Sequence, residues 1–357
     1  MPLAREDYLR RLEAVRSRLS ALPADGLVAT PSSNLFYLTG IDFHRSERLT
    51  ALLLFRDAEP VVVCPAFEEA RLRGMSAVPR VVCWSETEDA FAKAASLFPA
   101  DAGVLAIEPS TAYDDAERLL ARRPRWKGLS AASLFGALRM VKTPEEIATI
   151  RRAIGVAMER FRRTFASLRP GTVESDVSRA FGGENVVQFG PSSALPHGAS
   201  TSRRLAANEA VLIDAWDRPD GYYYDITRST FFGEPTDEYR KVWSIVLEAQ
   251  GAAIEKAAPG VPCFEVDASA RRVIEKAGFG DYFTHRLGHG LGIDVHEPPY
   301  MVGHDRTPLE PGMTFTSEPG IYLPGRFGVR IEDDILVTER GAESLSPRVS
   351  RLEPLGA

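Results

Sequence analysis

Two pairs of acidic residues in the second half of the chain stand where hairpin geometry would bring them together. Asp214 and Asp225 flank the turn sequence Arg218-Pro219-Asp220-Gly221, and a turn centred in the middle of that sequence would place them directly opposite each other. Residues opposed on antiparallel strands have Cβ atoms about 4.5–5.5 Å apart. Glu318 and Glu332 are likewise symmetric about a glycine in a second turn. Carboxylate pairs this close in an interior repel strongly unless they are protonated or bind metal.

A histidine cluster lies between the two hairpins in sequence and favours metal over protonation. His285, His289 and His296 fall within residues 285–298, among glycines that let the backbone approach closely. Four carboxylates and one imidazole form a hard, oxygen-rich donor set suited to manganese or a similar divalent ion. Two divalent ions balance four carboxylates and leave a metal-bridging hydroxide as a nucleophile at neutral pH. The pattern therefore predicts metal-dependent hydrolysis.

Simpler explanations apply to several other residues. A single buried aspartate more often bonds to backbone than to metal, but two symmetric pairs beside a histidine cluster weaken that explanation. His44 and His304 stand alone and are interpreted as ordinary core or surface histidines. The glycines within residues 288–292 lack the preceding strand and the spacing of a nucleotide-binding loop. The arginines within residues 151–163 are interpreted as the solvated face of a helix.

The second part of the chain predicts a mixed scaffold of helices and strands for these side chains. Thr143-Pro144-Glu145-Glu146 combines a capping threonine, a proline at the first helical position and a glutamate at the third, which predicts a helix start. The apolar face of this helix comprises Ile147, Ile150, Ile154, Met158 and Phe161. Further helices are predicted over 237–257 and 266–277, and strands over 211–214, 222–232, 313–318 and 329–337.

The first part of the chain predicts strands that alternate with helices. Tyr8, Leu12, Val15, Leu19 and Leu22 recur at spacings of four and three, which predicts an amphipathic helix. Short apolar runs follow at 26–29, 50–55, 60–63, 80–83 and 103–107, and helical stretches at about 66–73, 89–97 and 114–122. This alternation predicts an α/β layer of roughly 130 residues.

Composition sets the outer limits. A chain of 357 residues is too long for one comfortable hydrophobic core and suits two domains. With 44% hydrophobic and 26% charged residues, it reads as globular rather than disordered. No apolar stretch approaches the roughly 20 residues of a membrane-spanning helix, and the N-terminus lacks the apolar core of a signal peptide.

Cysteine usage and net charge narrow the class further. Cys64, Cys83 and Cys263 are an odd number and widely spaced, which argues against a disulfide framework or a thiolate zinc site and predicts a reducing, cytoplasmic location. The formal net charge of −6 argues against nucleic acid or an anionic membrane as a partner.

Taken together, the motifs resemble the pita-bread metallopeptidases, in the branch that contains Xaa-Pro dipeptidase (prolidase) and Xaa-Pro aminopeptidase. The resemblance rests on Leu195-Pro196-His197-Gly198, residues 211–214, Gly221-Tyr222, Asp225-x-Thr227-Arg228, residues 285–298, residues 318–322 and residues 328–334. The first domain is similar to the N-terminal domain of the same branch, mainly through Phe36-Tyr37-Leu38-Thr39-Gly40.

The resemblance implies a fold and a set of roles. The fold would be an N-terminal α/β domain of the creatinase/prolidase type over residues 1–137 and an α+β pita-bread catalytic domain over residues 138–357. The ligands of two metal ions would be Asp214, Asp225, His289, Glu318 and Glu332, with Asp225 and Glu332 bridging. Glu318 would also accept a proton from the attacking water. His197, His285 and His296 would hold the substrate and the developing charge, and Tyr322 and Arg330 would lie near the proline side of the pocket. One departure is Ala215-Trp216 after the first ligand, where the family often has a small Gly-Ala pair.

The implied activity is hydrolysis of Xaa-Pro bonds in small peptides, with dipeptides favoured because the chain is compact. The alternative is an Xaa-Pro aminopeptidase (aminopeptidase P) acting on longer peptides. Arg330 could hold the proline carboxylate in either enzyme. Arg45 and Arg48 could reach a substrate from the first domain or a partner subunit, but pairing with Glu47 at the surface is the favoured interpretation.

Other members of the fold provide further alternatives. Some have lost the metal ligands and bind peptides or proteins, whereas all five ligand positions are present here. Methionine aminopeptidase usually lacks so large an N-terminal domain, and creatine hydrolysis does not use the five-ligand site. The resemblance also implies a homodimer and a metal that is manganese, with cobalt or zinc possible.

Overall fold

The computed structural model describes residues 3–356, and the chain forms two compact units, Met1–Leu138 and Arg139–Ala357. Among the described residues, no helix has the length and apolar character needed to cross a membrane. All three cysteines carry free thiols.

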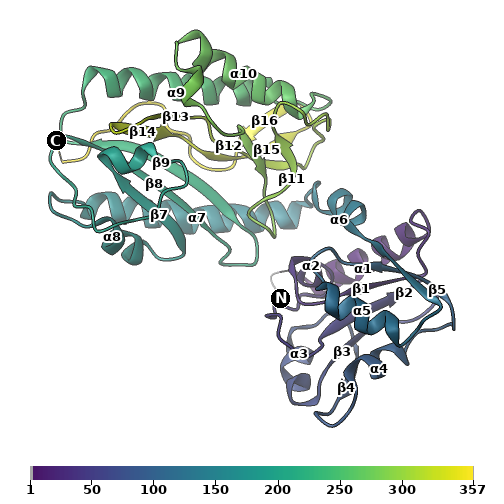
Figure 1. Ribbon diagram of the computed structural model, residues 1–357. Helices are drawn as coiled ribbons and strands as arrows, with labels where there is room; N and C mark the ends of the chain where they lie inside the picture. Colours follow the sequence, from purple (N-terminus) through teal and green to yellow (C-terminus); the bar gives the residue numbers. More distant parts are fainter. Residues whose placement is uncertain (1–2, 357) are drawn as a thin grey trace. The chain divides into compact units, whose positions relative to one another are not determined.

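The first unit is built on one mixed sheet of six strands in the order β4-β3-β2-β1-β5-β6 (Figure 1). Its strands are β1 (Gly26–Ala29), β2 (Ala51–Phe55), β3 (Val61–Pro65), β4 (Arg80–Trp84), β5 (Gly103–Ile107) and β6 (Trp126–Ser130). Its helices are α1 (Arg5–Leu19), α2 (Ser33–Thr39), η1 (Ala66–Glu68), α3 (Glu69–Met75), α4 (Ala90–Ala95), α5 (Tyr113–Ala121) and α6 (Ala132–Arg139), the last ending at the first residue of the second unit.

The predicted α/β layer is confirmed. All five predicted strands form within two residues of their expected bounds, and the apolar stripe of α1 buries Tyr8, Leu12, Val15 and Leu19. The elements α2, α6 and β6, which complete the layer, were not predicted.

The second unit carries three small sheets between helices. The sheets have the orders β7-β8-β9, β11-β10-β12-β15-β16 and β13-β14. Their strands are β7 (Glu184–Phe189), β8 (Glu209–Asp217), β9 (Tyr224–Phe232), β10 (Gly288–Gly290), β11 (Glu297–Met301), β12 (Thr314–Ser317), β13 (Gly320–Leu323), β14 (Phe327–Arg330), β15 (Asp333–Thr338) and β16 (Gly341–Ser344). The helices are α7 (Pro144–Ser167), α8 (Glu174–Phe181), η2 (Gly190–Ala194), α9 (Asp237–Lys256), α10 (Cys263–Lys276) and η3 (Gly280–Tyr282).

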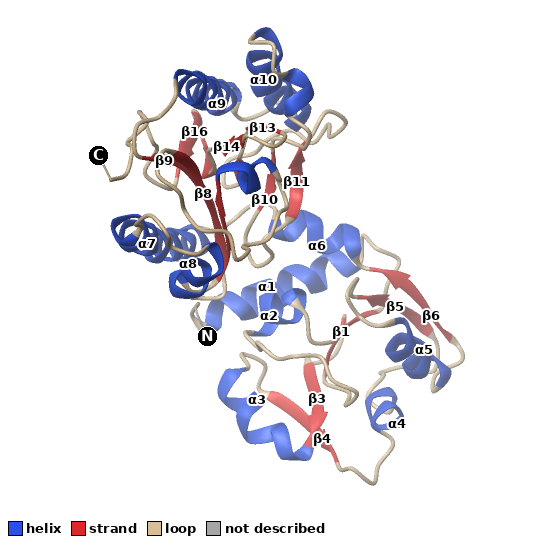
Figure 2. Ribbon diagram, turned by 60° about the vertical axis from the view of Figure 1, so that its left-hand side comes forward, coloured by secondary structure: helices blue, strands red, loops and turns tan. Residues whose placement is uncertain are grey.

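Helices cover the strands of this unit from two sides. Figures 1 and 2 show α9 and α10 on one side of the strands and α7 with α8 on the other. The predicted start of α7 is confirmed, because Thr143 Oγ1 accepts from Glu146 N–H at 3.3 Å and Glu146 Oε2 accepts from Thr143 N–H at 2.8 Å. The core between α9, α10 and the strands is apolar, with Val242, Val266 and Phe315 fully buried. The sheets are therefore held rigidly enough to position side chains on their inner faces.

One predicted strand is broken, and the break matters for the site. The run 329–337 was expected as one strand, but β14 ends at Arg330 and β15 begins at Asp333. The two pieces pair with different partners, β14 with β13 and β15 with β12. Between them, Glu332 N–H donates to Thr227 O at 3.1 Å on β9. The expectation was wrong because this tertiary contact redirects the chain at Glu332.

Candidate metal centre

The first hairpin brings Asp214 and Asp225 to one face of the sheet, although not directly opposite each other. The predicted register was wrong by two residues: Asp214 on β8 pairs with Thr227, and Asp225 on β9 pairs with Trp216. The six residues 218–223 connect the strands, so the turn is wider than the predicted one. A shift of two keeps every side chain on its face, whereas a shift of one would have moved Asp225 to the other side. The two carboxylates therefore still face one site as diagonal neighbours.

The second hairpin has the predicted symmetry. β13 and β14 pair in a register centred on Gly325, as Gly320↔Arg330 and Leu323↔Phe327 show. Glu318 and Glu332 lie two residues beyond this ladder on its two strands. Glu318 N–H donates to Leu287 O at 2.9 Å, which ties it to the segment that leads into β10.

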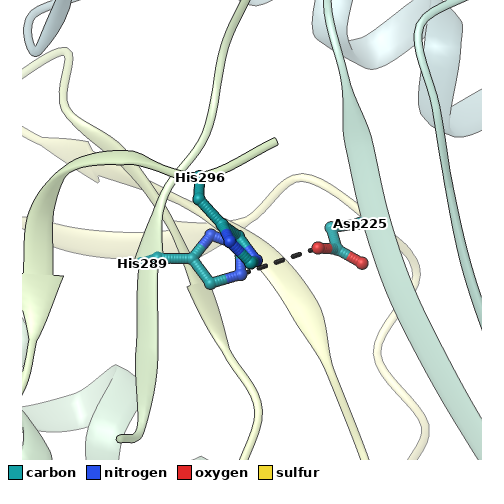
Figure 3. A group of neighbouring side chains, drawn as sticks. All are labelled: Asp225, His289 and His296. Atoms are coloured by element: carbon teal, nitrogen blue, oxygen red, sulfur yellow. Dashed lines mark ion pairs between the residues drawn. The ribbon is translucent and has the colours of Figure 1, made fainter. Parts of the chain in front are cut away.

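His289 sits in the middle of β10, where two glycines allow close packing of the backbone. A Cβ at Gly288 would lie 1.8 Å from Thr316 O, and one at Gly290 would lie 2.4 Å from Pro298 O. His289 Nδ1 lies 3.1 Å from Gly290 O and donates to it, because a carbonyl oxygen can only accept; this contact fixes the orientation of the ring. Nε2 faces Glu318 Oε1 at 3.3 Å. It also faces Asp225 Oδ2 at 3.6 Å (Figure 3). The ring is thus oriented as a metal ligand would be.

The structure brings all five predicted ligands together in overlapping groups. Within each group, the possible donor atoms lie within 4.8 Å of one another. The groups are Asp214, Asp225 and Glu332; His289, Glu318 and Glu332; and Asp225, His289 and His296. Asp225, His289 and Glu332 each belong to two groups, so these three side chains connect the neighbouring donor sets.

The electrostatics of the cluster show an excess of negative charge. Burial, with the nearby Glu332 and Asp214 carboxylates, raises the pKa of Asp225 well above its usual value. Burial and the Glu318 charge likewise raise the pKa of Glu332. Burial also acts to raise the pKa of Glu318, but the hydrogen bond and charge of His289 prevail and lower it to about 2. Arg330 is the main cation among these carboxylates, so the donor set fits hard divalent cations, which would supply the missing charge.

Arg330 and Thr227 connect the two hairpins through hydrogen bonds that include the Asp214 and Glu332 carboxylates. The guanidinium of Arg330 donates from Nε to Thr227 Oγ1 at 2.9 Å, from one terminal nitrogen to Tyr322 OH at 2.9 Å, and from the other to Asp214 Oδ2 at 2.7 Å. Thr227 Oγ1 also lies 2.8 Å from Asp214 Oδ1 and 2.6 Å from Glu332 Oε2. Thr227 belongs to one of the motifs that carry the family resemblance, but no role was predicted for it. The correct register, which places it opposite Asp214, would have revealed one.

A second layer of acidic residues was also missed. Asp225 N–H lies 3.3 Å from both carboxylate oxygens of Asp334, and burial raises the pKa of Asp334 well above its usual value. Asp333 is fully buried and bonds to Arg228 at 2.7 Å and to Gln250 at 3.0 Å. These contacts anchor the start of β15, directly after Glu332, against β9 and α9.

The three predicted substrate histidines line one cavity with the ligands. The cavity has a volume of about 650 Å³, and its wall includes His197, His285, His296, Arg286 and Trp216. His285 is engaged, with Nε2 2.8 Å from Tyr322 OH, and burial lowers its pKa. His296 is exposed, and its ring centroid lies 4.0 Å from that of His289. Trp216, at the position that departs from the family, therefore shapes this cavity.

The residues treated as ordinary lie elsewhere. His44 and His304 do not line this cavity. In the first unit, Arg48 pairs with Glu47 and, at 3.0 Å, with Glu86. Arg45 lies 3.4 Å from Asp115. The predicted surface pairing of Arg48 is thus observed.

Comparison with known proteins agrees with this geometry. The model of metallopeptidase family M24 matches residues 148–339, and that of the creatinase/prolidase N-terminal domain matches residues 11–141. An uncharacterized peptidase of Staphylococcus aureus (strain bovine RF122 / ET3-1) is 36% identical over 95% of this chain and 99% of its own.

Solved structures of the same architecture cover nearly the whole chain. Dipeptidase PepE from Mycobacterium ulcerans has a TM-score of 0.90 at 34% identity, covering 99% of both chains. Recombinant prolidase from Thermococcus sibiricus has a TM-score of 0.91 at 32% identity, covering 98% of this chain and 99% of its own. X-Pro aminopeptidase from Thermotoga maritima has a TM-score of 0.85 at 28% identity, covering 97% of this chain and 99% of its own.

Fold and site together define a metallopeptidase in which a creatinase-type N-terminal domain is followed along the chain by a pita-bread catalytic domain. The chain belongs to metallopeptidase family M24. Both the predicted family and the predicted fold are confirmed.

Proposed function

We propose that this enzyme hydrolyses Xaa-Pro bonds, preferentially in dipeptides, with two divalent metal ions held by Asp214, Asp225, His289, Glu318 and Glu332. The observation that carries the proposal is the overlap of three donor groups, in which the Asp214 group shares Glu332 with the Glu318 group and Asp225 with the His296 group. Two similar structures bear the names prolidase and X-Pro aminopeptidase, which supports proline after the scissile bond. The bound ions would activate water for attack at neutral pH and polarise the peptide carbonyl.

To Glu318 we assign the role of accepting a proton from the attacking water. Its low pKa keeps it ionised. Thr316 Oγ1 donates to Glu318 Oε1 at 3.2 Å, and the side chain remains 15% exposed, toward the cavity. A carboxylate held in one orientation at the cavity wall can take up a proton and pass it to the leaving nitrogen.

To His197 and His296 we assign the contacts with the substrate carbonyls. Both side chains line the cavity and are exposed there. Burial and the neighbouring His289 lower the pKa of His296 to about 4, so the ring is a neutral hydrogen-bond donor at pH 7. A donor aimed at the developing oxyanion is typically worth about 2.7–4 kcal/mol.

The preference for dipeptides requires a cation for the free carboxylate of proline. Arg330 was the expected candidate, but all three of its guanidinium nitrogens already donate to protein oxygens. Arg286 lines the same cavity, stacks 4.8 Å over the Tyr300 ring, and pairs with no carboxylate in residues 3–356. We therefore assign the carboxylate contact to Arg286, where a planar guanidinium can bind both oxygens.

The experiment compares one Xaa-Pro dipeptide with its C-terminal amide and with the same dipeptide extended by several residues. Wild-type enzyme should have its lowest KM for the free dipeptide. The Arg286→Met variant should have a higher KM for the free dipeptide and an unchanged KM for the dipeptide amide. Arg118→Met is the matched control, because Arg118 also stacks on an aromatic ring, Phe91 at 4.0 Å, but lies in the first unit. Faster cleavage of the extended peptide would make the enzyme an Xaa-Pro aminopeptidase instead.

Manganese is the proposed metal, since the donor set is rich in oxygen; cobalt and zinc are the alternatives. Activity should disappear on exhaustive chelation and return with Mn²⁺ added to the depleted protein. Competition among the three metals at equal free concentration would identify the preferred one.

We also propose a homodimer located in the cytoplasm. The dimer is proposed from the resemblance, and the location from the three free thiols, which suit a reducing compartment. Light scattering should give twice the chain mass, and a monomer at micromolar concentration would refute the dimer.

A further inference from the structure

The His296 side chain makes few contacts that would fix its position. Its side chain is exposed, and its ring packs against His289 at a centroid distance of 4.0 Å (Figure 3). Within residues 3–356 the imidazole forms no hydrogen bond with another residue. The position of the ring therefore depends mainly on the backbone that carries it.

The next residue along that backbone is anchored far more firmly. Glu297 is buried, and its Oε1 accepts from Lys142 Nζ at 2.8 Å while Oε2 accepts from Arg139. Arg139 also bonds to Asp294 Oδ2 at 2.7 Å, on the other side of His296. The side chains of Lys142 and Glu297 are only 1% and 4% exposed, so each charge depends on the other for compensation.

Arg139, Lys142, Asp294 and Glu297 form an ion cluster, and the backbone beside Lys142 is bonded to the segment that leads to the metal centre. Lys142 N–H donates to Gly312 O at 2.9 Å, and Val141 forms a bridge with Met313. From there the chain runs directly through β12 to Glu318. The ion cluster thus connects the His296 segment to the strand that delivers a metal ligand.

A glycine leaves room for these side chains to meet. A Cβ at Gly292 would lie 2.7 Å from Glu297 Oε1 and 3.0 Å from Lys142 Cε. Tyr223 N–H donates to Gly292 O at 2.7 Å, which fixes the segment at its other end to the first hairpin.

We propose that Arg139, Lys142 and Glu297 are positioning residues, which set the place of the His296 ring relative to the metal ligands. The proposal rests on the substrate contact assigned to His296 above. None of the three lines the catalytic cavity, so they act through His296 and not on the substrate. Misplacing a reacting group by about 1 Å can cost on the order of 100-fold in rate.

The test is a double-mutant cycle with Glu297→Gln, Lys142→Met and Gly292→Ala, each made alone and together with His296→Ala. In the wild-type background each change should lower kcat about 10–100-fold while metal content stays at its wild-type value. In the His296→Ala background the same changes should have almost no further effect. Arg160→Met, which removes the 2.8 Å pair with Asp217 in the same unit, is the control for loss of an ion pair.

Four outcomes separate the possibilities. Equal fold-losses in both backgrounds would overturn the positioning role and leave general destabilisation as the cause. Unchanged kcat in a folded variant would overturn it as well, and Gly292→Ala serves if Lys142→Met does not fold. Full activity of His296→Ala alone would refute the substrate contact assigned to His296 and the positioning role with it. A wild-type protein without Xaa-Pro hydrolysis would instead refute the proposed function on which the inference rests.

Discussion

Replacing Thr227 by valine removes a hydroxyl group that contacts both hairpins of the metal centre. That hydroxyl oxygen lies 2.8 Å from Asp214 Oδ1 and 2.6 Å from Glu332 Oε2, and it accepts from Arg330 Nε at 2.9 Å. Valine has nearly the same shape, so the change deletes these contacts without opening a cavity. Because a hydroxyl has a single proton, it donates to one carboxylate at a time and orients whichever needs it.

The expected magnitude follows from two separate losses. Groups that orient metal ligands are typically worth 10–100-fold in metal affinity, which is about 1.4–2.8 kcal/mol. Arg330 is only 4% exposed, so leaving its Nε without an acceptor should also cost about 1–3 kcal/mol of folding stability. For a unit of this size, each kcal/mol lowers Tm by about 2–4 °C.

The assay is calorimetric titration of metal-depleted protein with Mn²⁺, together with a thermal melt. Thr230→Val is the matched control, since Thr230 lies on the same strand, is buried, and donates to Glu353 O at 2.7 Å, away from the ligands. Both variants should lose stability, but only Thr227→Val should bind metal more weakly. Wild-type affinity in Thr227→Val, or equal weakening in the control, would refute the reasoning.

Three further predictions test other parts of the site. His296→Ala should retain its metal by elemental analysis and lose about 100–1,000-fold in kcat, and normal turnover would contradict its assigned role. Glu332→Gln should bind fewer than two ions per chain, and undiminished metal content would show that Glu332 is not shared. Burial acts to raise the pKa of Glu297, but Lys142 and Arg139 prevail and lower it. Its stabilisation is therefore complete above pH 4.5 and is lost as pH falls further, so Glu297→Gln should flatten the fall in Tm below pH 4.5; an unchanged acid profile would contradict this.

Residue type, spacing and turn symmetry were sufficient to predict that the four carboxylates lie close together, whereas the choice of His289 among the three histidines came from the family resemblance. The second hairpin shows this best, since its register is centred on Gly325 as predicted. The first hairpin differs because Tyr223 N–H is bonded to Gly292 O, a contact between segments far apart in sequence that widens the turn. Local turn preferences carry no information about such a contact.

Other features could not be predicted because they also depend on contacts between segments far apart in sequence. Lys142 and Glu297 are 155 positions apart, and nothing in either local sequence indicates that they form a buried pair. The break at Glu332 also depends on a distant acceptor, Thr227 O. Periodicity predicts which segments form strands, whereas the packing of those strands decides where they end.

The central claim is that five side chains hold two metal ions that hydrolyse Xaa-Pro bonds. The most direct test is to add Mn²⁺ stepwise to fully depleted protein and to follow both bound metal and cleavage of an Xaa-Pro dipeptide. Binding should saturate at about two ions per chain, and activity should rise from none to a plateau as that ratio is reached. Full activity in depleted protein, or saturation without any cleavage of the dipeptide, would contradict the claim.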